Sequence, residues 1–210
     1  MFPKYESIKE AVNERVVAVV RGSSFEEAIA ISKAAIAGGI RAIEVTYTTP
    51  QVRKVFEALL DENAVIGAGT VLDSETARDA ILNGAQFVVS PNFDEKIATL
   101  CNRYSVPYFP GCMTIAEMVR AVESGCDIIK LFPANQFEPS FIGSVNGPLP
   151  NVRVMPTGGI SLKNASEWID AGAVAVGIGS DLTKAYRNDG VSAVMELAKK
   201  YVELTGGDPK

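Results

Sequence analysis

The chain has 210 residues, of which 47% are hydrophobic, and this length and composition suit one compact domain with a sizeable core. Its formal net charge of -5 comes from interspersed carboxylates and amines without a basic block, which argues against binding to nucleic acid or to an anionic membrane surface. The sequence contains no histidine. The commonest general base and the usual zinc ligand are therefore excluded, and acid–base chemistry must use carboxylate, lysine, tyrosine or water.

Two further features bear on where the protein works. No apolar run approaches the roughly 18 residues that a membrane-spanning helix needs, and the segment MFPKYESIKE lacks the pattern of a secretory signal. We therefore expect a cytoplasmic protein. Its three cysteines, Cys101, Cys112 and Cys126, form neither a CxxC pair nor a disulfide framework, so we expect buried, reduced thiols.

Short runs rich in Val and Ile alternate with longer segments of helical periodicity, at intervals of roughly 20 to 24 residues. This alternation is typical of repeated βα units around a parallel sheet. Eight strands are predicted, over residues 16–21, 42–48, 65–71, 87–91, 107–112, 128–133, 152–157 and 175–180. The amphipathic segments between them begin with Ser, Thr or acidic residues suited to amino-terminal caps and end in glycine; examples are residues 25–39, 74–85, 114–126 and 161–173.

Eight βα units in about 200 residues predict an α/β fold, a single (β/α)8 TIM barrel. We expect residues 1–210 to form one domain, with 205–210 as a flexible tail. An open doubly wound sheet is the alternative, but it would normally have fewer strands and a glycine-rich dinucleotide turn after the first one. Residues 20–23 occupy that turn with the sequence VRGS, which does not match GxGxxG.

Two charged residues interrupt the apolar strands: Lys130 in DIIKLFP and Glu44 in AIEVT. Both faces of a barrel strand are buried, so such residues need a partner or a function. Active sites of this fold gather at the carboxyl ends of the strands, where side chains from distant strands converge. Burial disfavours the charged form of a lysine and frees the amine to form an imine with a ketone, while a nearby carboxylate transfers protons. The alternative is a purely structural ion pair between Lys130 and Glu44.

Three other side chains are candidates for substrate contacts. Arg21 ends the first strand, where it could bind a carboxylate or phosphate, or could pair with an acid at the barrel rim. Thr70 ends the GAGT run and could hydrogen-bond a ligand or fill a layer of the barrel. Phe132, on the same strand face as Lys130, could wall an imine pocket or belong to the core.

Glycine-rich turns follow the last two predicted strands. The residues concerned are Thr157, Gly158, Gly159, Gly177, Gly179 and Ser180. Loops at this place in a barrel often hold phosphate through backbone amides and the amino terminus of a helix. The two turns therefore predict a phosphate site, although tight turns alone would need the same glycines.

The ordered motifs IEVTYTTP, GAGTV, SPNFD, PGCMT, IKLFPA, PTGGI and GIGSDL together resemble the 2-keto-3-deoxy-6-phosphogluconate (KDPG) and 4-hydroxy-2-oxoglutarate (KHG) aldolase family. The resemblance runs from about residue 16 to the last helix. It implies a class I, Schiff-base aldolase on a (β/α)8 barrel that needs neither metal nor cofactor and is usually a homotrimer.

On this resemblance the chain would cleave a phosphorylated 2-keto acid, 2-dehydro-3-deoxy-6-phosphogluconate, to pyruvate and glyceraldehyde 3-phosphate, or 4-hydroxy-2-oxoglutarate to pyruvate and glyoxylate. The 6-phosphogalactonate epimer is an alternative substrate. Two different kinds of protein also stay open: another phosphate-binding barrel, either an isomerase or a synthase, and a non-catalytic barrel that binds a metabolite.

The resemblance also assigns roles by position. Lys130 matches the imine-forming nucleophile and Glu44 the proton shuttle, while Thr70 matches a contact to the pyruvate carboxylate. Thr157 matches a contact to the substrate's hydroxyl region, and the phosphate-binding turns match Gly158, Gly159, Gly179 and Ser180. Well-known members have an arginine four residues after the glutamate, where this chain has Thr48. Arg21 would then be the substitute cation for the carboxylate.

Overall fold

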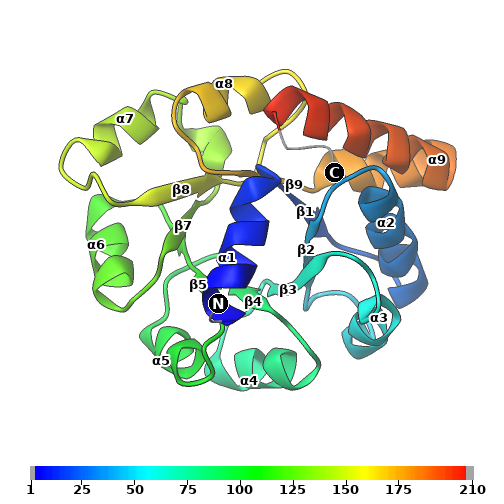
Figure 1. Ribbon diagram of the computed structural model, residues 1–210, viewed down its shortest axis with the longest axis horizontal. Helices are drawn as coiled ribbons and strands as arrows, with labels where there is room; N and C mark the ends of the chain where they lie inside the picture. The colour runs from blue at the N-terminus through cyan, green and yellow to red at the C-terminus, as the bar shows by residue number, and fades with distance from the viewer. Residues whose placement is uncertain (1–2, 207–210) are drawn as a thin grey trace.

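The computed structural model describes residues 3–206, which form an α/β fold with a curled parallel sheet inside a ring of helices (Figure 1). The strands are β1 (Val16–Val20), β2 (Ala42–Thr46), β3 (Val65–Gly69), β4 (Phe87–Val89), β5 (Tyr108–Phe109), β6 (Gly111–Cys112), β7 (Ile128–Leu131), β8 (Arg153–Pro156) and β9 (Val176–Ile178). The helices are α1 (Pro3–Asn13), α2 (Phe25–Ala37), α3 (Val52–Leu59), α4 (Ser74–Leu82), α5 (Glu95–Arg103), α6 (Ile115–Glu123), α7 (Phe141–Asn146), α8 (Ala165–Asp170) and α9 (Ser180–Thr205), with a 3-10 turn at Ala134–Gln136.

The strands pair in parallel in two sheets, with the orders β5-β4-β3-β2-β1-β9 and β6-β7-β8. Contacts at two edges link the sheets. Pro110 separates β5 from β6, because proline has no N–H to donate to a ladder, yet its carbonyl still accepts a hydrogen bond from the Lys130 N–H at 2.9 Å. At the other edge, Thr157, which directly follows β8, forms an isolated parallel bridge with Gly177 of β9.

The predicted strands begin within one residue of the observed ones, but most of them were predicted to end too late. The chain leaves the ladders before Arg21, Thr48 and Val71, where it turns into the loops that lead to the helices. Thr70, for example, already has a left-handed φ of 56° and cannot continue a strand. The fifth predicted strand, 107–112, is divided at Pro110.

An apolar cluster fills much of the space that the strands enclose, mainly towards their amino-terminal ends. Its buried members are Ala11, Val17, Ala42, Val65, Phe87, Val89, Phe109, Ile128, Met155 and Ala175. Helix α1 contributes Ala11 and lies across the strands in Figure 1, so it covers this end of the sheet. Glu44 and Lys130 are each two residues beyond a member of the cluster, Ala42 and Ile128, and therefore project to the same side, above an apolar floor.

The three cysteines are buried and free, as expected. Burial raises the pKa of the Cys101, Cys112 and Cys126 thiols to about 12. Among residues 3–206, no helix is both long enough and apolar enough to cross a lipid bilayer. Of the expected tail, Thr205 is buried as the last residue of α9, whereas residues 207–210 lie outside the part of the chain that the structure describes.

Candidate active site

Lys130 and Glu44 meet inside the curled sheet although they are far apart in the sequence. Lys130 lies on β7 and Glu44 on β2, and the Lys130 Nζ is 3.4 Å from the Glu44 Oε1. The two residues are only 5% and 1% exposed. The face of the Phe132 ring lies beside the amine, with the ring centroid 5.2 Å from the Nζ. The pair therefore combines an amine, a carboxylate and an apolar wall away from bulk water.

Glycine makes room for the glutamate. A Cβ added at Gly69, at the end of β3, would lie 2.2 Å from the Glu44 Oε1 and 2.5 Å from its Cγ. The Glu44 side chain thus occupies the space that a side chain on β3 would need. In the same way, a Cβ at Gly177 would lie 2.2 Å from the Thr157 Oγ1. Both glycines are needed for close approach of a functional side chain.

Two oxygen atoms of this site are buried without a hydrogen-bond partner among the described residues: the Glu44 Oε2 and the Thr157 Oγ1. Leaving a buried polar atom unsatisfied costs about 1–3 kcal/mol, so such atoms are uncommon in folded proteins. Thr157 also lines a cavity at the carboxyl ends of the strands. The unpaired Thr157 hydroxyl in the cavity wall suits the binding of a ligand that carries hydroxyl groups or of water.

The cavity has a volume of about 710 Å³, which suits a ligand of metabolite size. Its wall includes seven predicted site residues: Arg21, Phe132, Thr157, Gly158, Gly159, Gly179 and Ser180. Three cationic side chains, Arg21, Lys184 and Arg187, also line it, and none of its described wall residues carries a carboxylate. A cavity with this charge selects an anionic ligand. Lys130, Glu44 and Thr70 are not part of the wall.

Arg21 and Thr70 are brought together at one end of the site. The Arg21 Nη2 donates to the Thr70 Oγ1 at 3.4 Å, and the two residues follow β1 and β3, the strands on either side of β2. Thr48 also lines the cavity, and its hydroxyl lies 3.1 Å from the Thr46 Oγ1. A guanidinium beside a hydroxyl group can bind a carboxylate.

The end of the cavity that the loops after β8 and β9 form has the geometry of an anion site. Gly158 and Gly159 adopt positive φ angles of 93° and 80°, which turn the chain tightly after β8. Gly179 caps α9, and Ser180 begins it. The first N–H groups of a helix have no carbonyl partner within the helix and carry a partial positive charge. This end of the cavity can therefore hold a phosphate.

Three residues that the sequence reasoning missed belong to the same end. Lys184 and Arg187 line the cavity from α9, and Glu27, at the third position of α2, pairs with Arg187. Lys184 and Arg187 are three residues apart, a spacing that places both on one face of a helix and could have been noticed. Glu27 follows Ser24 in the S-x-x-E pattern of a capping box. Because this pattern already explains the glutamate, the sequence gives no reason to expect its contact with Arg187 of α9.

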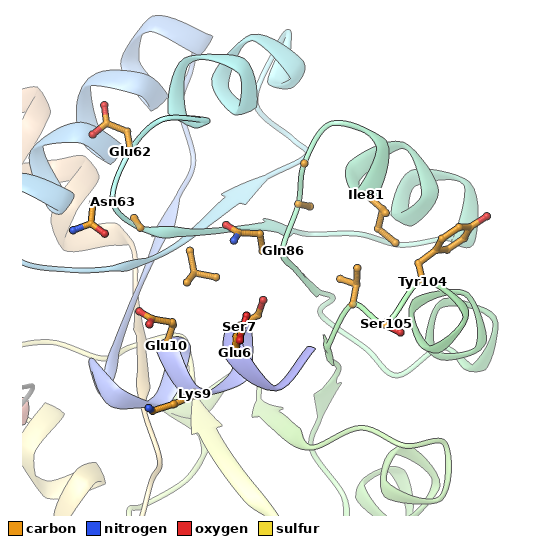
Figure 2. A pocket seen from close by; sticks show the side chains of 15 residues that line it. Glu6, Ser7, Lys9, Glu10, Glu62, Asn63, Ile81, Gln86, Tyr104 and Ser105 are labelled. Atoms are coloured by element: carbon orange, nitrogen blue, oxygen red, sulfur yellow. The ribbon is translucent and has the colours of Figure 1, made fainter. Parts of the chain in front are cut away.

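A second cavity, of about 800 Å³, lies at the amino ends of β3, β4 and β5, next to α1 (Figure 2). Glu6 and Glu10 of α1 and Glu62 of the preceding loop are among its lining residues. None of the predicted site residues lines it. Within the described part of the chain, no group of three or more His, Cys, Asp or Glu side chains is arranged to hold a metal ion, at either end of the sheet.

Comparisons with known proteins agree with the geometry. A family model described as KDPG and KHG aldolase matches residues 7–197. The 2-dehydro-3-deoxy-6-phosphogalactonate aldolase of Escherichia coli (strain K12) is 35% identical over 174 residues, which cover 81% of this chain and 85% of that protein. The 2-dehydro-3-deoxy-phosphogluconate aldolase of Treponema pallidum (strain Nichols) is 39% identical over 158 residues, covering 74% of this chain and 75% of that protein.

A solved structure extends the likeness to the fold. The KDPG aldolase from Legionella pneumophila, with pyruvate captured as a covalent carbinolamine intermediate, superposes with a TM-score of 0.81 and 29% identity. The match covers 95% of this chain and 97% of that one.

Proposed function

This chain belongs to the KDPG and KHG aldolase family, and from that membership we propose that it is a class I carbon–carbon lyase that uses Lys130 as its imine-forming amine. The substrate is a phosphorylated 2-keto-3-deoxy acid, which is cleaved to pyruvate and glyceraldehyde 3-phosphate. The observation that carries the proposal is the buried contact between the Lys130 Nζ and the Glu44 Oε1, 3.4 Å apart. An amine with a carboxylate beside it is the pair of groups that imine formation requires.

The reaction begins when the Lys130 amine attacks the C2 carbonyl carbon of the substrate. Glu44 delivers the proton with which the former carbonyl oxygen leaves as water, and an iminium ion remains. Glu44 then accepts the proton of the C4 hydroxyl, the C3–C4 bond breaks, and its electron pair enters the iminium to form an enamine. The aldehyde is released. Protonation of the enamine at C3 and addition of water release pyruvate and restore the Lys130 amine.

The other site residues hold the substrate in this orientation. Arg21 and Thr70 bind the carboxylate at C1, Thr157 donates to or accepts from a substrate hydroxyl, and Phe132 shields the imine from water. The backbone of Gly158, Gly159, Gly179 and Ser180 binds the phosphate. The unpartnered Thr157 Oγ1 and Glu44 Oε2 support these assignments, since each would find a hydrogen-bond partner in the bound substrate.

The reaction needs neither a metal ion nor an organic cofactor, because the iminium itself accepts the electron pair of the breaking bond. We expect a chelator to leave the rate of cleavage unchanged. A loss of activity on dialysis against a chelator, restored by a divalent cation, would contradict this part of the proposal.

The stereochemistry at C4 decides which phosphorylated acid is preferred. Relatives named for both the gluconate-derived and the galactonate-derived substrate are similar to this chain, and 4-hydroxy-2-oxoglutarate is a third candidate. The cationic wall of the cavity supports an anionic group at the far end of the substrate. Pyruvate release from the three compounds, assayed side by side, identifies the substrate.

We extend the proposal to the architecture that carries this site. Residues 1–210 form one domain whose strands close into an eight-stranded (β/α)8 barrel, with β5 and β6 as one strand interrupted at Pro110. The hydrogen bond from the Lys130 N–H to the Pro110 carbonyl and the Thr157–Gly177 bridge support closure of the barrel at the two edges where the sheets meet.

The protein acts as a homotrimer. Exposed apolar side chains near the carboxyl ends of the strands, Leu72, Met113 and Ile115, support an interface, and sedimentation analysis tests it.

Borohydride reduction tests the central step. In the presence of pyruvate, sodium borohydride should convert the imine to a stable amine, add the reduced pyruvyl group to one peptide, and place it on Lys130 by mass spectrometry. Cleavage activity should be lost in proportion. Cleavage that persists with Lys130 unmodified would refute the proposal. Stabilisation of the protein by pyruvate without turnover of any of the three acids would instead indicate a metabolite-binding barrel.

A further inference from the structure

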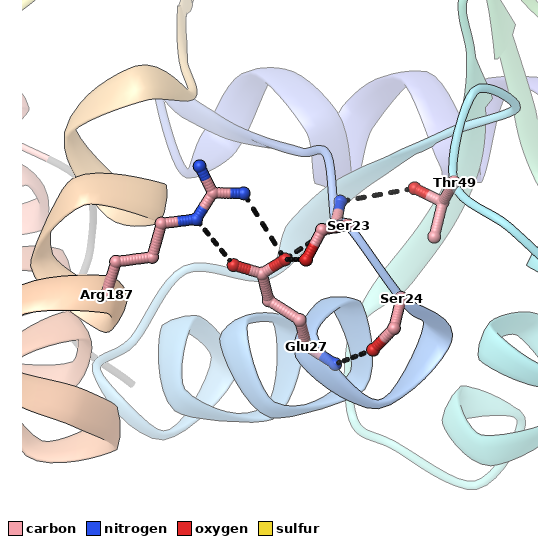
Figure 3. Close-up of polar contacts among 6 residues, drawn as sticks. Ser23, Ser24, Glu27, Thr49 and Arg187 are labelled. Carbon is pink, nitrogen blue, oxygen red and sulfur yellow. Dashed lines mark hydrogen bonds and ion pairs between the residues drawn. The ribbon is translucent and has the colours of Figure 1, made fainter.

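One carboxylate joins the last helix to the loop after β1 at the rim of the cavity (Figure 3). The Arg187 Nε donates to the Glu27 Oε1 at 2.8 Å, and the Arg187 Nη2 donates to the Glu27 Oε2 at 3.4 Å. From the other side, the backbone N–H and the hydroxyl of Ser23 both donate to the Glu27 Oε2 at 2.5 Å. Glu27 therefore fixes the position of Ser23 and the orientation of the Arg187 guanidinium together.

Glu27 acts here as a charged group. It is 8% exposed, and its pKa is lowered to about 2, chiefly by the hydrogen bond from Arg187 and further by those from Ser23, against the opposing effect of burial. The four donors fill most of the acceptor capacity of a carboxylate. Such a carboxylate has little affinity left for a ligand, so its role is to hold its neighbours.

Arg187 keeps hydrogen-bonding capacity for a ligand. A guanidinium has five N–H groups, and only two of them donate to acceptors within the described residues. The side chain is 56% exposed and lines the cavity together with Ser180, Thr183 and Lys184, beside the amino terminus of α9. Lys184 makes no ion pair within residues 3–206, so its charge also remains available.

We propose that Glu27 and Arg187 form a charge-selecting unit that makes this enzyme specific for a phosphate ester over a carboxylate or a free hydroxyl at the far end of the substrate. Arg187 contacts the phosphate and determines specificity, while Glu27 is a positioning residue that presents the free N–H groups of the guanidinium to it. This inference rests on the proposed function, since it assigns the group that the aldolase cavity selects.

The chemistry of the site favours a dianion. Arg187 and Lys184 supply two positive charges, Glu27 cancels one of them, and the amino terminus of α9 adds about half a charge. No carboxylate lines the described wall, and the nearby carboxylates of Glu27 and Asp181 are occupied by hydrogen bonds from Arg187 and Tyr201. A guanidinium binds phosphate oxygens with two parallel hydrogen bonds, which an ammonium group or a backbone amide alone does not provide. A hydroxyl group would leave the same N–H groups without a charged acceptor.

The test compares a phosphorylated 2-keto-3-deoxy acid with its dephosphorylated counterpart in wild type, Arg187→Gln and Glu27→Gln. Arg187→Gln should lower kcat/KM for the phosphorylated substrate about tenfold or more through KM, with kcat within about twofold and no change for the dephosphorylated one. Glu27→Gln should change the same ratio in the same direction but less. Arg53→Gln is the matched control, because Arg53 pairs with Asp79 outside the cavity. An equal loss for both substrates, or none, would overturn the proposal.

Binding of inorganic phosphate, measured by calorimetry, separates this inference from the proposed function. Wild type should bind phosphate several-fold more tightly than Arg187→Gln even if no keto acid is cleaved, whereas cleavage by wild type with equal phosphate affinity in both proteins would overturn the charge-selecting unit alone. Arg187→Lys keeps the positive charge but lacks the paired N–H donors of a guanidinium, so it should recover only part of the affinity for phosphate. If Glu27→Gln does not fold, the Arg187 variants and the phosphate measurement still decide the question.

Discussion

At the scale of single residues, the Lys130–Glu44 pair is notable for the free energy that its burial costs. Each partner is almost completely buried, and each would be an isolated charge without the other. Removing one partner of a buried ion pair costs about 3–5 kcal/mol, because the remaining charge has lost its compensation. The pair therefore links stability to the proposed chemistry, and its variants must be examined for both.

We expect Lys130→Met to abolish cleavage and borohydride trapping, because methionine has no amine. Glu44→Gln should retain trapping, slowly, and lower kcat by roughly 10²- to 10⁴-fold, the usual contribution of a general acid or base. Chemical denaturation should show both variants to be destabilised. Steady-state rates, trapping and denaturation measured on the same preparations separate a loss of chemistry from a loss of folding. A Lys130→Met variant that still cleaved the substrate would rule out this amine as the nucleophile.

Thr70 provides a second prediction at this scale. Its φ of 56° is unfavourable for a β-branched residue, and strain of this kind costs on the order of 1–3 kcal/mol. We expect Thr70→Gly to leave the free energy of unfolding unchanged within about 1 kcal/mol or to raise it, since glycine relieves the strain but has a more flexible unfolded state. Because the hydroxyl next to Arg21 is lost, the KM for the keto acid should rise. A clear loss of stability would mean that Thr70 is held for structural reasons.

Sequence reasoning anticipated that Lys130 and Glu44 would lie together, but it did not anticipate the pair of Glu27 and Arg187. Lys130 and Glu44 were conspicuous because a charge inside an apolar strand has few explanations. Arg187 was missed because an arginine on an amphipathic helix is ordinary, and only the fold brings it next to Glu27, 160 positions earlier in the chain. Long-range pairs between two residues that each look normal leave no signal in a single sequence.

At the scale of elements, the Glu44 side chain of β2 fits against β3 only because residue 69 is a glycine. Gly69→Ala would place a Cβ 2.2 Å from the Glu44 Oε1, a distance that forces the glutamate to move. We expect a fall in kcat similar to that of Glu44→Gln, although alanine at this position touches no substrate. The catalytic rate and the trapping yield at Lys130 measure the effect.

Gly143 is the matched control for this substitution. It lies in α7, and a Cβ added there meets no atom within 4 Å. Gly143→Ala should therefore keep full activity and stabilise the protein by about 0.5–1 kcal/mol, as alanine does in a helix. If both alanine variants had the same activity, the close approach at Gly69 would not position Glu44.

The elements themselves were predictable to different degrees. Periodicity located the strands, because buried parallel strands are nearly continuous apolar runs. It extended them too far, since residues such as Thr48 look like strand residues but already belong to the loops. Helix α1 was not predicted at all. It covers the amino-terminal end of the sheet with few apolar residues, of which Ala11 is buried in the inner cluster and Ile8 and Val12 pack against it, and within residues 3–206 no strand precedes it to mark a βα unit.

At the scale of the whole molecule, the candidate site and the apolar cluster occupy different ends of the curled sheet. The apolar cluster under α1 fills the amino-terminal end, and the cavity with its cations opens at the carboxyl ends. The alternation of the strands predicted this division, since a barrel has one packed end and one end with loops. Closure between the first and last βα units was not predictable in detail, because it depends on contacts such as the one between Glu27 and Arg187.

The contact between Glu27 and Arg187 makes the stability of the fold depend on pH. The folded-state pKa of Glu27, about 2, lies below its ordinary value of 4.5, so its contribution to stability is present above about pH 4.5 and is lost as the pH falls towards 2. The contribution is on the order of 3 kcal/mol at most, because solvent screens the interaction with the exposed Arg187 guanidinium. We expect wild type to exceed Glu27→Gln by up to this amount at pH 7 and the difference to shrink steadily between pH 5 and pH 2. Urea denaturation at a series of pH values measures it. A difference that did not change with pH would mean that the Glu27 carboxylate is not held by Arg187 in solution, and the orientation of the guanidinium at the cavity would then need another cause.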